Sequence, residues 1–273
     1  MIRSREARIV LVAGTVKIPD WPGHHDYLAG CSLLAELLGP TPGLTAAVVR
    51  DGWPEDERTL EGADALVFYS GGGRKLPFLA APKRLELLQR LIDRGVGLVM
   101  IHQAVSYPDE LAERAAGWLG GVHVAGQSSR GHWRTHHRDF PPHPVTRGVA
   151  PWRIRDGWLN RVRFPEADVI TPLVWSGPKH RGASSGGLDD VVGWAYERRG
   201  GGRSFCFSGL DAHGAWSRPG VRRLIVNGIL WSAGLPVPEG GASTAVDAIR
   251  LRSYLTPRSR IGWLLRRAGL SQR

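Results

Sequence analysis

Two short segments carry residue types that could do chemistry. Residues 22–27 read PGHHDY and follow the first apolar run, and residues 99–103 read VMIHQ and close the fourth. In an open α/β sheet, ligands bind outside the carboxyl ends of the strands, so distant segments meet there. Imidazoles bind divalent metals such as Zn or Mn, and one imidazole alone can act as a general base near neutral pH. We therefore predict that His25 and His102 face one cavity as catalytic residues and metal ligands.

Other residues are expected to complete this site. His213 is the predicted third metal ligand, and either it or His132 supplies a third polar group. Asp26 either assists catalysis by orienting an imidazole or caps the helix that begins near Tyr27. His24 is interpreted as a flanking loop residue.

Sugar recognition is the predicted task of a second group of side chains. In His132-Trp133 an indole face could pack on pyranose C–H groups while the imidazole binds a hydroxyl. Packing of Trp133 inside a long loop is the alternative. Asp156 and Trp216 are the remaining predicted substrate contacts.

The elements that must position these residues alternate between strands and helices. We expect strands at 9–13, 44–49, 65–69 and 96–101, and helices at 28–38, 82–94 and 108–119. This alternation predicts an α/β fold with a mostly parallel sheet. After Gly120, long polar loops are expected to separate short strands near 153–155, 169–175, 190–196 and 203–208, before a last helix at 218–233. Residues 1–240 are interpreted as one domain and 241–273 as a basic extension.

Composition narrows the class of protein. The 273 residues carry a net charge of +11, but residues 247–273 hold seven Arg and one Asp, which leaves +5 for the rest. Because the excess charge lies in one tail without a readout motif, nucleic-acid binding is disfavoured. The tail itself could rest on anionic lipid or RNA, or serve as a solvated extension or packing arm.

The chain shows no targeting or membrane signal. It has no apolar run near the roughly 20 residues of a membrane span, and no secretory signal pattern. Two isolated cysteines suit a reducing compartment, so a cytoplasmic protein is expected. A homo-oligomer is left open by the sequence.

An ordered set of motifs resembles a known family. The matching segments are PGHHDY at 22–27, GGG at 71–73, GLVMIH at 97–102, GHW at 131–133, HPVTRGV at 143–149 and VGWAYER at 192–198. In this order they resemble the trehalose-utilisation (ThuA-like) family over roughly residues 8–235. The resemblance implies the class I glutamine amidotransferase-like fold, a flavodoxin-like three-layer sandwich. It also implies an association with sugar metabolism, particularly with oxidised sugars or disaccharides.

The residues argue against two activities that this fold suggests. A glutamine amidotransferase needs a cysteine nucleophile on the turn after a central strand, and that turn here reads IHQA at 101–104. Cys31 and Cys206 are expected in a helix and a strand instead. Gly71–Gly73 lacks the ending of a phosphate-binding loop, and no Gly-x-Gly-x-x-Gly follows the first strand, so no nucleotide cofactor is predicted.

The chain departs from the family pattern in one place. Where relatives commonly show Asp-Glu-x-Tyr, residues 156–159 read DGWL, and near His213 it offers Asp211 or Gly214 in place of a second histidine. Two hypotheses follow. The first is an enzyme that acts on a sugar or sugar derivative through a histidine-lined, metal-dependent or metal-free site. The second is a non-catalytic carbohydrate-binding or interaction protein with a degenerate site.

Overall fold

Continuous apolar runs form the middle of a seven-stranded sheet in the computed structural model, which describes residues 6–15, 23–166, 169–178 and 187–255. From edge to edge the strands are β2 (Leu44–Val49), β1 (Ala7–Ala13), β3 (Ala65–Tyr69), β4 (Gly97–Ile101), β11 (Arg203–Phe207), β10 (Val191–Glu197) and β9 (Ile170–Trp175). The first five are parallel, and β10 and β9 are antiparallel to their neighbours. β3 and β4 are buried throughout, as strands covered on both faces must be.

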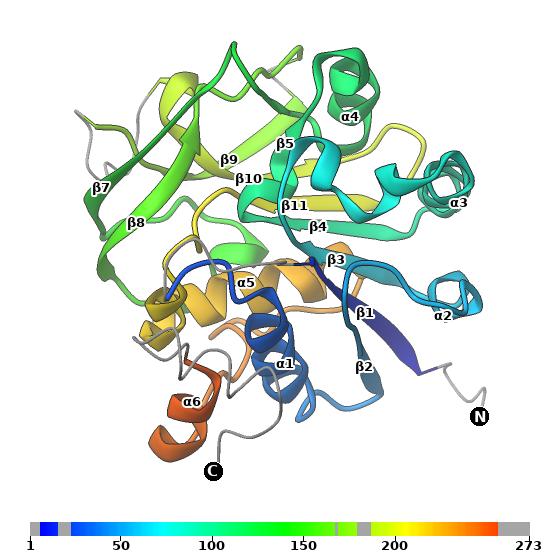
Figure 1. Cartoon of the computed structure of the whole chain (residues 1–273). Coiled ribbons are helices and arrows are strands. Elements are labelled where there is room, and N and C mark those ends of the chain that lie inside the picture. Colours follow the sequence, from blue (N-terminus) through cyan, green and yellow to red (C-terminus); the bar gives the residue numbers. More distant parts are fainter. Residues whose placement is uncertain (1–5, 16–22, 167–168, 179–186, 256–273) are drawn as a thin grey trace.

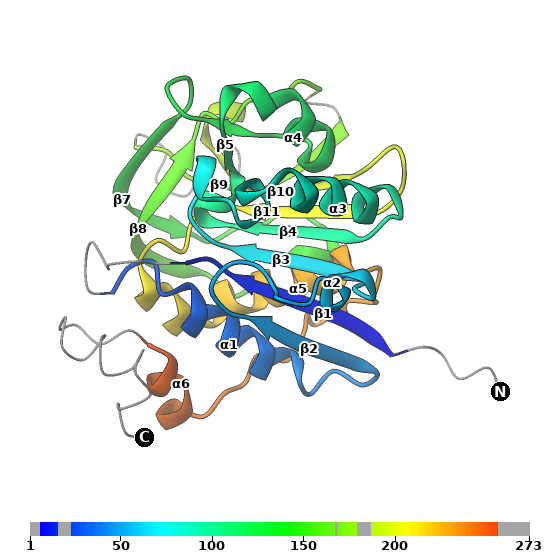
Figure 2. The same ribbon diagram turned by 45° about the vertical axis from the view of Figure 1, so that its right-hand side comes forward.

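Helices cover both faces of the sheet (Figures 1 and 2). On one face lie α1 (Tyr27–Leu38) and α5 (Pro219–Ser232). On the other lie α2 (Arg58–Glu61), α3 (Pro82–Asp93) and α4 (Ala112–Leu119). The strand order β2-β1-β3-β4-β11 is the flavodoxin-like order, so the predicted α/β sandwich with a mostly parallel sheet is confirmed.

A register fixed by hydrogen bonds aligns the carboxyl ends of four strands. Ala13 of β1 lies opposite Tyr69 of β3, Tyr69 opposite Ile101 of β4, and Ile101 opposite Phe207 of β11. The residues that follow these strands therefore emerge at one level along the same edge of the sheet. His102 is one of them.

The region after α4 differs from the expectation. Instead of long loops with a short strand at 153–155, it contains a two-stranded antiparallel ribbon of β7 (Ser129–His137) and β8 (Trp152–Asn160). Trp133 accordingly lies in a strand. β7 was missed because its residues, SRGHWRTHH, are mostly polar, with exposed side chains alternating with half-buried ones along its first half. The pairing of β7 with β8 supplies the strand character that its hydropathy does not show.

Short elements complete the chain. The two-residue strands β5 (Ser106–Tyr107) and β6 (His123–Val124) pair in parallel. Short 3-10 helices lie at Gly73–Lys75, Pro77–Ala80, His102–Val105, Asp109–Leu111, Pro144–Thr146, Leu188–Asp190 and His213–Ser217. None of the helices in the described ranges is long and apolar enough to cross a membrane.

The described part of the C-terminal extension packs on the sandwich. Its helix α6 (Ala248–Tyr254) lies beside α1, where Arg250 Nε is 2.7 Å from Glu36 Oε2 and the Tyr254 hydroxyl also bonds Glu36. Upstream, the backbone N–H of Ala242 donates to Asn227 Oδ1 of α5 at 2.8 Å. Residues 241–255 thus form a packing arm, one of the predicted alternatives. Residues 256–273, which hold five of the seven tail arginines, lie outside the described part.

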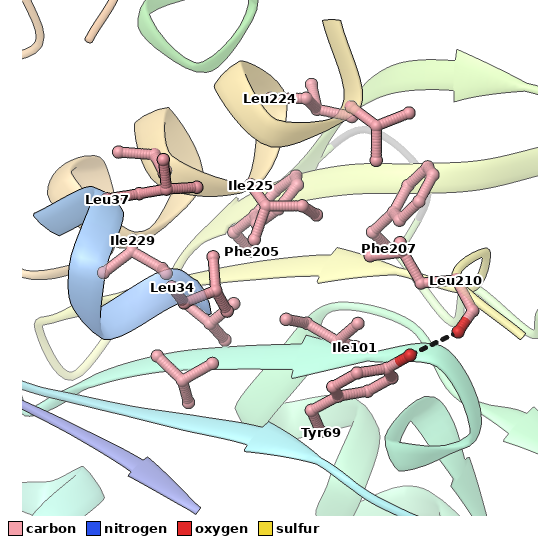
Figure 3. Close-up of a cluster of buried hydrophobic side chains, with 14 of the residues drawn as sticks. Leu34, Leu37, Tyr69, Ile101, Phe205, Phe207, Leu210, Leu224, Ile225 and Ile229 are labelled. Atoms are coloured by element: carbon pink, nitrogen blue, oxygen red, sulfur yellow. Dashed lines mark hydrogen bonds between the residues drawn. The ribbon is translucent and has the colours of Figure 1, made fainter. Parts of the chain in front are cut away.

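The core between the sheet and its α1/α5 face supplies much of the apolar burial. Figure 3 shows Leu34 of α1 and Ile229 of α5 in one cluster with Ile101 and Phe205 of the sheet. All four side chains are fully buried. Interiors are close-packed, so a deleted side chain leaves a cavity that neighbours fill only in part.

We expect Ile229→Ala to lower the free energy of unfolding by about 2–5 kcal/mol, because it removes buried methylene groups and leaves a cavity. The matched control is Ile249→Ala in α6, where the isoleucine is 77% exposed and the change should stay within about 0.5 kcal/mol. Urea titrations of both variants measure the difference. Equal losses would contradict the assigned core.

A second prediction concerns His137, a buried side chain of β7 that packs against Trp152 and Trp158. Burial lowers the pKa of His137 to about 3. In the unfolded chain a histidine has a pKa of about 6.5, so below that pH the unfolded state binds the proton first. This side chain should therefore cost stability as pH falls from about 6.5 towards 3, with a slope of about 1.4 kcal/mol per pH unit.

His137→Phe should remove this contribution and flatten the decline of stability over that pH range. Denaturant midpoints measured at several pH values compare the variant with the unmodified chain. His136→Phe, at the neighbouring and more exposed histidine, is the control. If His137→Phe left the slope of the decline unchanged, the buried neutral state of His137 would be refuted.

Candidate functional site

Four imidazoles surround the carboxylate of Asp211. Its Oδ1 lies 2.7 Å from His25 Nε2 and 3.4 Å from His102 Nε2. Its Oδ2 lies 3.0 Å from His24 Nδ1 and 2.7 Å from His132 Nε2. The side chains of Asp211 and His102 are almost fully buried, whereas that of His132 is 55% exposed. The cluster therefore runs from the protein interior to solvent.

The sheet brings these residues together. His102 directly follows β4, and Asp211 lies in the segment that leaves the adjacent strand β11. The segment before α1 is joined to the Asp211 segment by backbone contacts: His24 forms a β-bridge with Ala212, and the N–H of His213 donates to Gly23 at 2.7 Å. His132 arrives from the β7–β8 ribbon. The predicted convergence of His25 and His102 is observed, with ring centroids 5.2 Å apart.

Three non-glycine residues of this site have left-handed backbones. The φ angles are +54° at His25, +60° at His102 and +70° at Leu210. Such conformations cost of order 1–3 kcal/mol each and persist only where the surroundings enforce them. These residues lie in the three turns that carry His25, His102 and Asp211, since Leu210 immediately precedes Asp211. Strain that gathers where polar side chains meet is typical of functional sites.

A second aspartate holds the loop that carries Asp211. The buried Asp156 carboxylate accepts the backbone N–H of Ala212 at 2.7 Å, of Leu210 at 2.8 Å and of Gly157 at 2.9 Å. The Tyr69 hydroxyl donates to the Leu210 carbonyl at 2.6 Å, drawn as the dashed line in Figure 3. Asp156 was predicted as a substrate contact, but its oxygens are occupied by the loop, so it is a positioning residue.

The space beside Gly157, where the sequence departs from the family pattern, is occupied by another side chain. A Cβ at this position would lie 2.4 Å from Asp211 Oδ2 and 2.8 Å from Asp211 Cβ. The volume that a side chain at 157 would enter is therefore filled by the Asp211 carboxylate. An acidic group therefore occupies the space beside Gly157.

Charge at the site is dominated by the ionised Asp211. Burial opposes its ionisation, but contacts with His102, His24 and His25 outweigh burial and hold the pKa of the carboxyl well below its usual range. The bond to Asp211 raises the pKa of His24. Burial lowers the pKa of His102, which favours its neutral form. The site thus combines a fixed anion with imidazoles in different environments.

The donor set suits a divalent metal. Two groups of three ligand atoms lie within 4.8 Å of one another: His25, His102 and Asp211 form one, and His24, His132 and Asp211 the other. Zinc–ligand distances of about 2.0–2.1 Å place neighbouring ligand atoms about 3 Å apart around the ion. The distances of 2.7 and 3.4 Å from Oδ1 to His25 and His102 are of this size.

The surroundings of the two His102 ring nitrogens test whether this residue fits as a metal ligand. His102 Nδ1 is 3.3 Å from the Ser208 carbonyl, which can only accept, so in the neutral ring a hydrogen on Nδ1 leaves Nε2 as the ligand atom that faces Asp211. Both His102 Nε2 and His25 Nε2 are buried and lie near Asp211 Oδ1, at 3.4 and 2.7 Å. Metal-bound histidines commonly donate their other N–H to a backbone carbonyl in this way.

Several predicted site residues have other roles. His213 Nε2 lies 2.6 Å from the Tyr254 carbonyl of α6, and His213 is in neither ligand set, which corrects its assignment as a metal ligand. Asp26 caps α1 by accepting the N–H of Ala29 at 3.1 Å, the structural alternative for this residue. Trp216 is fully buried and therefore packs in the core rather than contacting substrate.

His132 and Trp133, the predicted sugar contacts, have different neighbours. His132 points at Asp211, whereas Trp133 is half-buried and donates its indole N–H to Ser176 Oγ at 2.9 Å. The alternation of a strand explains this, because successive side chains leave opposite faces. Trp133 therefore packs, in a strand rather than in the loop we expected.

Sequence reasoning missed His24 as a member of the cluster and assigned no role to Asp211. The signal for His24 was its place beside His25, but a pair of adjacent histidines does not tell which one faces inward. The signal for Asp211 was its place after β11, at the same edge of the sheet as His102. The backbone bridge between His24 and Ala212 joins the two segments, and the sequence does not show this contact.

The sulfur atoms lie away from this cluster. Cys31 lies inside α1 and Cys206 inside β11, both fully buried, and burial raises the pKa of each thiol. The turn after β4 presents His102. A hollow of about 620 Å³ opens at the opposite edge of the sheet, near Asp64 and Arg198.

We expect Asp156→Asn to lower the free energy of unfolding by about 1–3 kcal/mol. The amide would point an N–H₂ group at a backbone N–H of the Asp211 loop and leave buried donors without an acceptor. Chemical denaturation measures the loss, with Asp139→Asn in an exposed turn as the control. If the two variants lost equal stability, Asp156 would not hold the loop.

Comparisons with known proteins agree with the fold. The profile of the family described as trehalose utilisation, ThuA, matches residues 10–232. A putative ThuA-like protein from Parabacteroides merdae superposes with a TM-score of 0.57 at 16% identity, over 85% of this chain and 92% of that one. One from Bacteroides uniformis gives 0.59 at 13% identity, over 85% and 93%.

A glutamine amidotransferase from Thermotoga maritima matches at a TM-score of 0.45 and 14% identity, over 84% of this chain and 97% of that one. No curated protein matches the sequence. The family match spans most of the chain and agrees with the resemblance seen in its motifs. The chain therefore belongs to the trehalose-utilisation (ThuA) family.

Proposed function

We propose that this protein is an enzyme that acts on a sugar or sugar derivative through a divalent metal held by His25, His102 and Asp211. The observation that carries the proposal is the convergence of His25 Nε2 and His102 Nε2 on Asp211 Oδ1, at 2.7 and 3.4 Å. The lone pairs of neutral imidazoles repel a carboxylate oxygen at such distances, and a cation between them removes the repulsion. Zn or Mn is the expected ion.

The substrate class rests on the family. Its description is trehalose utilisation, and such families are expected to handle disaccharides or their oxidised derivatives. When bound, a divalent ion polarises a carbonyl oxygen or acidifies a water molecule. Asp211 supplies a fixed negative charge, and the Ser208 carbonyl keeps the His102 ring in one orientation. Substrate would reach the cluster on the side of His24 and His132, whose side chains are exposed.

Glutamine amidotransferase activity is not part of this proposal. That reaction needs a thiolate nucleophile, and the two cysteines of the chain are buried, away from the turn after β4. Nucleotide cofactors are likewise excluded from the proposal, since Gly71–Gly73 is followed by a 3-10 turn rather than by the N-terminus of an α-helix. A reducing, cytoplasmic setting suits the two unpaired thiols.

The alternative function is a carbohydrate-binding protein without turnover. It drew its support from Gly157 in place of an acidic residue. Because Asp211 fills the volume beside Gly157, the site keeps its carboxylate. This favours an enzyme over a degenerate site.

We expect the purified chain to retain Zn²⁺ or Mn²⁺ after dialysis, and to convert trehalose or one of its carbonyl-bearing derivatives. Substitution His102→Ala should lower metal content and abolish turnover, because it deletes a buried ligand. Elemental analysis measures the metal, and proton NMR of the sugar mixture measures turnover. His136→Ala, which removes a histidine of β7 away from Asp211, should leave both unchanged.

The outcomes separate the hypotheses. Sugar binding without conversion by the metal-loaded protein would establish the carbohydrate-binding alternative. Turnover by protein stripped of metal would replace the metal site with a general base. Failure to bind any divalent ion, with the chain folded, would overturn the metal-dependent proposal.

A further inference from the structure

We infer that the site holds two divalent ions, and that Asp211 bridges them with one oxygen on each. This inference rests on the proposed metal site and adds a second position to it. The first ion would lie among His25, His102 and Asp211 Oδ1. The second would lie among His24, His132 and Asp211 Oδ2.

The division of the four histidines between the two oxygens carries the argument. Oδ1 has His25 at 2.7 Å and His102 at 3.4 Å, and Oδ2 has His132 at 2.7 Å and His24 at 3.0 Å. The two ligand sets share Asp211. The second pair of imidazoles lies at hydrogen-bonding distance of the other oxygen, and the same arrangement would place them around a second ion.

The backbone is built to split a pair of adjacent histidines. His24 forms the bridge to Ala212, while the next residue, His25, adopts φ +54° and donates its N–H to the Asp211 carbonyl at 3.3 Å. The left-handed turn sends the two rings to opposite sides of the carboxylate. Their centroids lie 6.3 Å apart, and their planes are inclined by 73°.

The partner rings complete two separate pairs. The His25 and His102 centroids lie 5.2 Å apart, and those of His24 and His132 lie 6.2 Å apart. In two-metal sites the ions are about 3.5–4 Å apart, a separation that the two oxygens of one carboxylate can span. Each pair offers two imidazoles and one carboxylate oxygen, so both ions would keep open coordination positions.

Exposure distinguishes the two positions. The first ligand set is buried, with side-chain exposures of 22% for His25 and 3% for His102. The second set opens to solvent, with exposures of 32% for His24 and 55% for His132. We therefore assign tight binding to the inner ion and exchangeable binding to the outer ion. Two divalent cations against one carboxylate also leave positive charge, which fits neighbouring oxygen atoms of a ligand, such as a hydroxyl beside a carbonyl or carboxylate.

The experiment counts ions. Apo protein is titrated with Mn²⁺, and bound metal is measured by equilibrium dialysis with elemental analysis. The unmodified chain should bind two equivalents, with unequal affinities. His132→Ala and His24→Ala, both at partly exposed positions, should each retain one equivalent of the tighter class. His136→Ala on the same strand as His132 should retain two.

A spectroscopic readout independent of activity confirms the bridge. Two Mn²⁺ ions joined by a carboxylate couple magnetically, so the loaded protein should give the multiline spectrum of a coupled pair in electron paramagnetic resonance. In His132→Ala this should become the six-line spectrum of an isolated ion. Asp211→Asn should lose the coupled signal, and circular dichroism verifies that this variant is folded.

The results distinguish the two proposals. One equivalent in the unmodified chain, lost in His102→Ala and kept in His132→Ala, would overturn the second position and leave the proposed function intact. One equivalent that depends on His132 but not on His102 would overturn both assignments of ligands. No bound metal in a folded chain would overturn the metal site as a whole.

Discussion

The buried carboxylate of Asp156 is the constraint on which the site depends. It accepts three backbone N–H groups of Gly157, Leu210 and Ala212, which no water can replace at this depth. Satisfying those donors fixes the loop after β11 in its left-handed turn. The loop then presents Asp211, and the four imidazoles meet at its carboxylate. An aspartate that touches no ligand thus determines where the reactive groups lie.

The fold contributes a second constraint, at the turn after β4. In the sharp turn after β4, His102 adopts φ +60°, and its side chain faces Asp211 at the carboxyl edge of the sheet. Such a turn exposes one side chain at the carboxyl edge of the sheet, whatever its type. Here that side chain is an imidazole. Its Nδ1 lies 3.3 Å from the carbonyl of Ser208, the residue that follows the neighbouring strand β11. Under the proposed function, this turn would hold one of the metal ligands.

The sequence predicted the central sheet and its helices because those segments are continuous apolar runs or helices with apolar periodicity. The meeting of His25 and His102 was expected from the flavodoxin-like strand order that the family resemblance implies, and their ring centroids lie 5.2 Å apart. Polar elements were harder: β7 pairs with β8 through its backbone, which no hydropathy pattern records.

The same limit explains the errors at the site. His213 and Asp211 lie two residues apart on one loop, and which of them faces the histidine cluster depends on the turn at Leu210 and the bonds to Asp156. Those are long-range contacts, since Asp156 lies 54 positions from Leu210. His213 instead lies beside α6, where its Nε2 is 2.6 Å from the Tyr254 carbonyl. From residue types alone, His213 was the expected member of the site, whereas the tertiary contacts place Asp211 there.

The enclosure of His102 bears on the choice between a general base and a metal ligand. A general base must reach the proton it removes, at about 2.6–3.2 Å or through one water. His102 Nε2 is buried and faces Asp211, whose oxygen carries no proton to give. Its Nδ1 is directed at Ser208, whose own N–H and hydroxyl are bound to Val192 and Leu159, so the ring cannot turn without breaking this arrangement. A group held so firmly with its lone pair towards an anion is suited to binding a cation.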